Sequence, residues 1–284
     1  MAPLDKITSL DKLAPRATRR RVICGCMLHR ETAVLDWRIH ELEAVVDDFV
    51  VVEAVTTHSG LPRNLIHPER NPRYAHLDGR LHGVVLADPP DGSDPWRREN
   101  GQREAIWYLG AALLQTSDED LVLISDADEV PFPEVVDRLA WSEFDEPMFV
   151  RPHWFNFNWK HYLGPWDHAS IHFYKAGYLK QLFAAGRASD LGQRVLPGIE
   201  IEGLNGWHAS WFGTDEDVLH KLVSYAHAFD SKDVQALAEG AAGIRRRRDA
   251  GLDMFGTRRA LPDTVRLPLH AHLLEGQKEP RSRG

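Results

Sequence analysis

Cysteine is scarce in this chain, with Cys24 and Cys26 as its two copies among 284 residues. Two residues separated by one position on a strand do not normally reach each other as a disulfide. Zinc sites built from four cysteines need a second cysteine pair, which this sequence lacks. The sequence therefore predicts two buried free thiols and a reducing compartment.

Positive charge and long apolar runs are scarce as well. The 34 Lys and Arg residues are outnumbered by 42 Asp and Glu residues, which gives a net charge of −8. This balance argues against electrostatic wrapping of nucleic acid and favours a small ligand. No run of 18 uninterrupted apolar residues occurs, and residues 1–21 lack the apolar core of a signal peptide. We expect no membrane span and a cytoplasmic location.

Hydrophobic patterning predicts an alternation of strands and helices in the first half of the chain. Helical spacing of apolar residues predicts helices over residues 33–46 and 98–115. Apolar runs predict buried strands at Val22–Leu28, Phe49–Val52, Leu81–Leu86 and Leu121–Ile124. This order predicts an α/β fold, Rossmann-like, with a mostly parallel sheet whose ligands lie beyond the carboxyl ends of the strands.

The second half of the chain has shorter apolar runs and an aromatic stretch, and this pattern predicts a smaller α+β region. Shorter strands are expected at Met148–Arg151 and Ala169–Tyr174, on either side of an aromatic stretch, and a helix over residues 215–229. We divide the chain into a flexible lead-in (residues 1–21), a ligand-binding half (22–135), a second half of the same domain (136–237) and a C-terminal tail (238–284).

The acidic turn Asp126-Ala127-Asp128, followed by Glu129, ends the last predicted strand of the first half. Carboxylate oxygens suit Mg²⁺ or Mn²⁺, and a site with few protein ligands leaves positions for phosphate oxygens. The turn therefore favours a metal-bound nucleoside diphosphate. The alternative is an acidic turn that ends a strand in solvent.

Four segments in the same order resemble glycosyltransferase family 17, over roughly residues 22–230. They are Asp36–Gly60, Trp96–Arg103, ISDADEVPFP around Asp126, and GWHASWFGTDEDVLHKL from Gly206 to Leu222. The resemblance implies a GT-A fold and metal-dependent, inverting transfer from a nucleotide sugar, UDP-N-acetylglucosamine in particular. The first half would bind the donor, and the second half would bind a glycan or small-molecule acceptor.

Glu53 and Arg103 are predicted to bind the donor nucleotide together with Asp126. Glu53 ends the second strand, where its carboxylate can accept hydrogen bonds from uracil or ribose, or can instead form a surface ion pair. Arg103 belongs to the pattern formed with Trp96 and Glu99, and its guanidinium fork suits uracil or diphosphate. The alternative for Arg103 is an exposed i,i+4 pair with Glu99.

Histidine and tryptophan residues complete the predicted site. His208 is a candidate third metal ligand beside Asp126 and Asp128, or else a core histidine between two tryptophans. The aromatic residues Trp154, Trp159 and Trp166 are candidates for a platform on which the acceptor sugar stacks, or else for core packing.

The general base is sought on the acidic turn at Asp215-Glu216-Asp217, where a helix begins. Glu216 best matches the family pattern and Asp217 is the second candidate, whereas simple helix capping is the alternative for this turn. If Glu216 is not the base, attention moves to Asp167, Asp190 or Asp217.

Two other functions use the same features. A metal-dependent sugar-nucleotide pyrophosphorylase or hydrolase would need the same acidic edge. A pyrophosphorylase usually has a glycine-rich phosphate loop near its first strand, however, and Gly25 is the one glycine in Cys24–Arg30. A non-catalytic carbohydrate-binding protein would need only the aromatic stretch. Turnover of the donor with metal and with EDTA separates these possibilities.

Overall fold

The computed structural model describes residues 6–90, 94–110, 114–258, 260 and 265–275. These residues form one ten-stranded sheet in the order β4-β3-β2-β5-β9-β7-β10-β1, with β6 on β10 and β8 on β7. The strands are β1 (Lys6–Thr8), β2 (Val22–Met27), β3 (Asp48–Ala54), β4 (Leu81–Leu86), β5 (Leu121–Ile124), β6 (Glu129–Pro131), β7 (Met148–Asn156), β8 (Tyr162–Pro165), β9 (Ile171–Lys175) and β10 (Ile199–Ser210).

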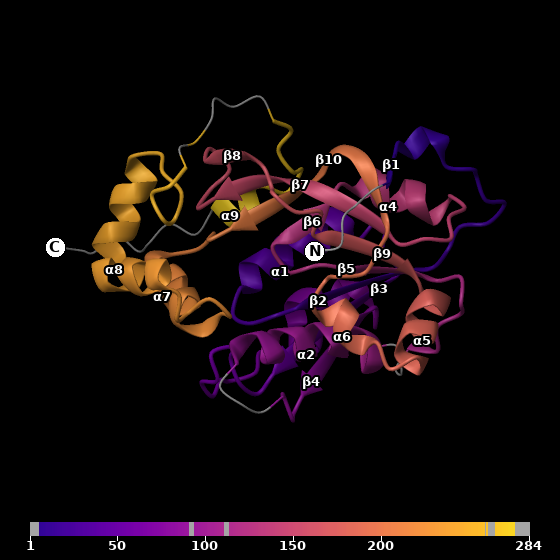
Figure 1. Cartoon of the computed structure of the whole chain (residues 1–284), viewed down its shortest axis with the longest axis horizontal. Coiled ribbons are helices and arrows are strands. Elements are labelled where there is room, and N and C mark those ends of the chain that lie inside the picture. The colour runs from indigo at the N-terminus through magenta and orange to yellow at the C-terminus, as the bar shows by residue number, and fades with distance from the viewer. Residues whose placement is uncertain (1–5, 91–93, 111–113, 259, 261–264, 276–284) are drawn as a thin grey trace.

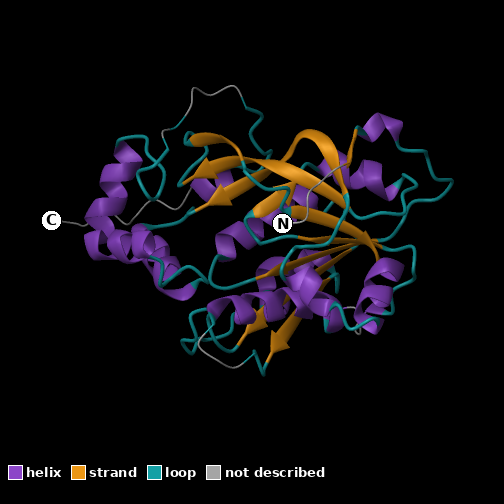
Figure 2. Ribbon diagram, viewed as in Figure 1, coloured by secondary structure: helices purple, strands orange, loops and turns teal. Residues whose placement is uncertain are grey.

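Helices cover both faces of this sheet. The helices are α1 (Thr32–Leu42), α2 (Pro95–Tyr108), α4 (Pro133–Ala140), α5 (Ala176–Ala184), α6 (Ala188–Gly192), α7 (Asp215–Ser224), α8 (Ser231–Asp249) and α9 (His272–Glu275). Short 3₁₀ turns occur at Leu10–Lys12, Pro68–Arg70 and Pro72–Leu77. Helices α1, α4 and α9 pack on one face, and α2, α5 and α6 pack on the other (Figures 1 and 2).

The central strands are buried on both faces because successive side chains point to opposite helix layers. In β3, Phe49 and Val51 pack into the α1 layer, whereas Val50 and Val52 pack into the α2 layer. Strands β4, β3, β2 and β5 are mutually parallel, and β9 is antiparallel to both β5 and β7. The predicted α/β fold with a mostly parallel sheet is confirmed, and Cys24 and Cys26 are free and buried as predicted.

The second half continues the same sheet. Strand β7 runs to Asn156, well beyond the predicted end, and pairs in parallel with β10, a twelve-residue strand that the sequence did not indicate. Gly206 lies where a Cβ would come within 2.7 Å of the Val130 carbonyl, so the approach of β6 to β10 requires a glycine.

Several predicted bounds also change. Part of the predicted lead-in forms regular contacts: β1 pairs in parallel with β10, and the buried Arg20 donates to the carbonyl of Ser142. Helix α2 ends at Tyr108, and residues 111–113 of the predicted helix lie outside the described residues. Within the described part of the chain, no helix combines the length and apolar character needed to cross a membrane.

A third small core joins helices α7 and α8 beyond the end of β10. Val218 and Leu222 of α7 pack with Ala236 and Ile244 of α8 and with Trp211. These two helices lie beside the carboxyl ends of the parallel strands, at the left of Figure 1. They form the outer wall of the cleft described next.

Candidate active site at the carboxyl ends of the strands

A cleft of about 1090 Å³ opens beyond the ends of β2, β5 and β10. Its walls come from the loop after β2, from α2, from the turn after β5 and from helices α7 and α8. The sequence-predicted residues that line it are Arg103, Asp126, Asp128, Trp154, Trp166 and His208. The position agrees with the general rule for ligand sites in parallel sheets.

The acidic turn is fixed at the cleft floor by backbone bonds. The Glu129 amide donates to the Asp126 carbonyl, and β6 then pairs antiparallel with β10 so that Glu129 lies opposite His208. The Ser125 hydroxyl donates to the Glu129 carbonyl over 2.7 Å. The turn is therefore held between two strands rather than free in solvent.

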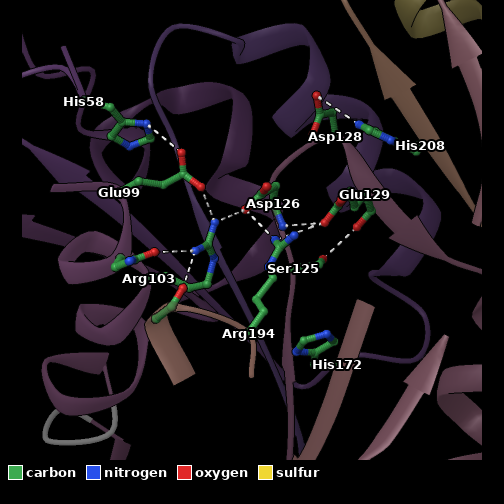
Figure 3. Close-up of polar contacts among 12 residues, drawn as sticks. His58, Glu99, Arg103, Ser125, Asp126, Asp128, Glu129, His172, Arg194 and His208 are labelled. Carbon is green, nitrogen blue, oxygen red and sulfur yellow. Dashed lines mark hydrogen bonds and ion pairs between the residues drawn. The ribbon is translucent and has the colours of Figure 1, made fainter. Parts of the chain in front are cut away.

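Asp126 is neutralised by two arginines from separate segments. Its Oδ1 lies 3.2 Å from Arg103 Nη2 and 2.7 Å from Arg194 Nη2, and Arg194 also reaches Glu129 Oε2 at 3.1 Å (Figure 3). Burial would raise the pKa of Asp126, but Arg194 and Arg103 outweigh it and hold that pKa well below its usual range. Asp126 is thus an ionised member of a charge network.

Asp128 faces a different set of partners. Its Oδ2 accepts a 2.9 Å hydrogen bond from Lys221 Nζ of α7 and lies 3.9 Å from His208 Nε2 of β10. Burial would lower the pKa of Lys221, but Asp128 and Glu31 raise it above its ordinary value. The ring of Trp166 contacts His208 edge-on, with centroids 4.4 Å apart.

The three predicted metal ligands do not gather around one point. Asp126 is directed toward the arginines and Asp128 toward His208, and within the described ranges no cluster of three His, Cys, Asp or Glu side chains could hold an ion. Asp128 and His208 remain as a carboxylate and imidazole pair. Such a pair fits a divalent cation that takes its other ligands from phosphate and water.

Arg103 is buried in the cleft wall rather than exposed on a helix face. Its side chain is 4% exposed, and it contacts Glu99 over 2.7 Å as the sequence alternative required. It also donates to the Gly192 carbonyl and reaches Asp126. The i,i+4 pair exists, but it is one part of a network that ties α2 to the acidic turn.

The aromatic residues are divided between cleft and core. Trp154 and Trp166 are partly exposed in the cleft, with ring centroids 4.7 Å apart. Arg258 lies over Trp154 and binds Asp167 at 2.6 Å. Trp159, in contrast, is 1% exposed and packs in the core, so its ring is not available to a sugar.

Glu53 has a structural setting outside the cleft. Its buried carboxylate accepts hydrogen bonds from Arg63 and from the backbone amides of Ile66 and His67, each 2.8 Å long. Glu53 therefore organises the loop after β3 and is not among the residues that line the cleft. We therefore do not include Glu53 among the residues of the candidate donor site.

The predicted catalytic turn begins helix α7. Asp217 forms a capping box with Thr214, and the buried Asp215 binds Arg245 and Arg248. Glu216 is exposed, and neither it nor Asp217 is among the residues that line the cleft. This placement matches the capping alternative. That Glu216 acts as the general base remains a prediction, and its position outside the cleft does not favour it.

Sequence reasoning missed Arg194 and Lys221. Arg194 lies in a loop with a left-handed φ of 55°, and no local pattern pointed to it. Lys221 follows Asp217 by one helical turn, so helical spacing within the resembling segment could have placed it on the same face.

A comparison with models of known protein families matches this chain to one family. The model of "Glycosyltransferase family 17" matches residues 2–257. Beta-1,4-mannosyl-glycoprotein 4-beta-N-acetylglucosaminyltransferases of Rattus norvegicus and Homo sapiens are each 29% identical over an alignment of 238 residues. The matches cover 75% of this chain but only 44% and 45% of theirs. The chain thus spans less than half the length of these relatives. Among solved structures, 4-diphosphocytidyl-2C-methyl-D-erythritol synthase covers 66% of this chain at 14% identity, with a TM-score of 0.39.

Proposed function

This chain belongs to glycosyltransferase family 17, and on that premise we propose that it transfers N-acetylglucosamine from UDP-N-acetylglucosamine to a hydroxyl group of a glycan or small molecule. The transfer proceeds with inversion and depends on Mn²⁺ or Mg²⁺. The observation that carries this proposal is the cleft itself, where the Asp128 and His208 pair, the buried Arg103, the partly exposed Arg194 and two partly exposed tryptophans face one volume.

Asp128 and His208 hold the cation in this proposal, through the carboxylate and the imidazole. When bound, the cation neutralises the charge that develops on the departing diphosphate. Asp126, kept ionised by Arg103 and Arg194, accepts a hydrogen bond from a hydroxyl of the donor. This division of roles explains why the two aspartates of the turn have different partners.

The acceptor binds at the wall that carries Trp154 and Trp166, since the C–H faces of a sugar pack against aromatic rings. Trp154 is oriented by a 2.7 Å hydrogen bond from its Nε1 to Ser210 Oγ. Asp167 follows Trp166 in this wall, and its carboxylate is exposed and paired with Arg258. We assign Asp167 as the group that removes the proton from the attacking hydroxyl.

A donor panel tests this function. The protein is mixed with UDP-N-acetylglucosamine, UDP-glucose or GDP-mannose, with Mn²⁺ or with EDTA, and thermal stability and UDP release are measured. We expect stabilisation by the UDP sugar only with Mn²⁺, and UDP release that increases with a mannose-containing acceptor. A ligand at a hundredfold excess over its Kd stabilises the native state by about 2.7 kcal/mol.

Each alternative function gives a different result in the same panel. A pyrophosphorylase would form UTP from pyrophosphate and the UDP sugar, and a hydrolase would release sugar without any response to acceptor. A carbohydrate-binding protein would be stabilised by glycans in EDTA and would release no UDP. Any of these results contradicts the proposed transfer.

A further inference from the structure

Lys221 occupies the same carboxylate oxygen that the proposed cation needs. Its Nζ is 2.9 Å from Asp128 Oδ2, and that oxygen is also the one that faces His208 Nε2. An ammonium group and a divalent cation cannot both sit on this oxygen without strong mutual repulsion. Ion binding at Asp128 and His208 therefore requires Lys221 to move.

A second carboxylate lies within reach of Lys221. Glu31 Oε1 is 3.9 Å from Nζ, and the other Glu31 oxygen accepts from the backbone amides of His29 and Arg30 at 3.3 and 2.9 Å. Glu31 is thus fixed by the backbone of the loop after β2. The flexible lysine stem allows Nζ to exchange partners while the helix stays in place.

The surroundings favour keeping the lysine charged in either position. Nζ lies 5.5 Å from the ring centroid of Trp211, and the side chain is 25% exposed on the cleft side. A diphosphate bound in the cleft would present a further anionic partner. The ammonium group of Lys221 can therefore leave Asp128 for either of two anionic partners, Glu31 or the bound diphosphate.

We propose that Lys221 is a tethered counter-ion of the candidate metal site. It holds Asp128 in the donor-free protein and leaves it for Glu31 or the diphosphate when donor and cation bind together. This inference rests on the proposed function, because it concerns the same cation. Its consequence is that metal and nucleotide bind cooperatively, since the donor removes the competitor for Asp128.

The test measures Mn²⁺ affinity by titration calorimetry or by electron paramagnetic resonance, with and without UDP. In the wild type, UDP should raise Mn²⁺ affinity at least about tenfold. In Lys221→Met, Mn²⁺ should bind the UDP-free protein about tenfold more tightly than it binds the wild type. The gain from UDP should be correspondingly smaller than in the wild type, because only the contribution of the phosphate ligands remains.

Lys232→Met is the matched control. Lys232 lines the same cleft, and its Nζ lies over the ring of Phe255 rather than against Asp128. Lys232→Met changes the net charge by the same amount as Lys221→Met. If the effect came only from the overall charge, Mn²⁺ affinity would change equally with and without UDP, and the ratio of the two affinities would be preserved. Lys221→Gln serves as a second variant, and melting curves establish that each protein is folded.

The outcomes separate this inference from the function on which it rests. If the wild type binds Mn²⁺ with UDP but both Lys221 variants keep its affinity and its ratio, the counter-ion role is overturned and the metal site stands. If Lys232→Met reduces the ratio as much as Lys221→Met, the role is also overturned. If neither the wild type nor any variant binds Mn²⁺ in the presence of UDP, the proposed metal site is wrong and the inference fails with it.

Discussion

The guanidinium of Arg194 bridges two carboxylates of the acidic turn, with Nη2 2.7 Å from Asp126 Oδ1 and 3.1 Å from Glu129 Oε2. Burial would lower the pKa of Arg194, but Asp126 and Glu129 raise it above its ordinary value. Arg194, from a distant loop, is also the main reason that the pKa of Asp126 at the cleft floor stays well below its usual range.

Loss of this bridge should destabilise the protein. We expect Arg194→Met to lower the free energy of unfolding by about 2–3 kcal/mol, because it leaves a buried carboxylate with fewer partners. Urea denaturation measures the change, and Asp126→Asn in the same background should recover part of it. The control Arg187→Met removes an exposed pair with Asp190 and should change stability by less than about 0.5 kcal/mol. Equal effects of the two arginine variants would contradict the assigned role.

The two aspartates of the turn should respond differently to substitution. Asp128→Ala should leave the fold intact but abolish the Mn²⁺-dependent part of UDP binding, because the carboxylate ligand is lost. Asp126→Asn should keep Mn²⁺ binding and reduce donor affinity, since its partners are Arg103 and Arg194. Calorimetric titration of UDP with and without Mn²⁺ gives both values. Unchanged UDP affinity in Asp128→Ala would rule out the proposed metal ligand.

The identity of the base can be tested with a pair of variants. Asp167→Asn should lower kcat by about 10²–10⁴-fold while UDP still binds, which is typical for the loss of a general base. Glu216→Gln should retain kcat within a few fold, because Glu216 is exposed at the start of α7 outside the cleft. Steady-state kinetics with an acceptor that the wild type glycosylates measures kcat for both variants. The reverse pattern would restore Glu216 as the base.

His172 should make stability depend on pH. Burial lowers the pKa of His172 to about 3, and Arg194 acts in the same direction. The unfolded state therefore binds more protons than the native state between about pH 6.5 and 3, so stability falls as pH falls through this window. The slope from this residue is at most about 1.4 kcal/mol per pH unit. Denaturation at several pH values should show a shallower slope in His172→Gln, and an identical slope would contradict this assignment.

Local pattern determined much of the first half of the fold. The predicted bounds of β4 and β5 agree with the structure, and the order of strands and α-helices from β2 to the acidic turn is as expected, whereas β1 was not predicted. These strands are covered by helices on both sides, so their sequences are continuous apolar runs. The turn is visible because Asp126 and Asp128 come directly after such a run, and strand direction alone places them at the cleft edge.

Strand β10 was invisible because its signal is not local. Gly203, Asn205 and Gly206 interrupt the alternation of apolar residues, and the strand forms by pairing with β7 through two register shifts. Pairing with a distant strand supplies the hydrogen bonds that the local pattern does not predict. His208 reaches the cleft only because this strand runs beside β7.

The partners of the acidic turn were likewise decided only by tertiary structure. Residue types identified Asp126 and Asp128 as candidate ligands, but they did not reveal that Arg194 and Lys221 would contact them from distant segments of the chain. Nor did they separate Trp159 in the core from Trp166 in the cleft. A sequence carries the chemistry of each side chain and its local periodicity. Which charges meet, and which rings remain exposed, depends on how the α7 helix, the loop at Arg194 and the long strands pack in space.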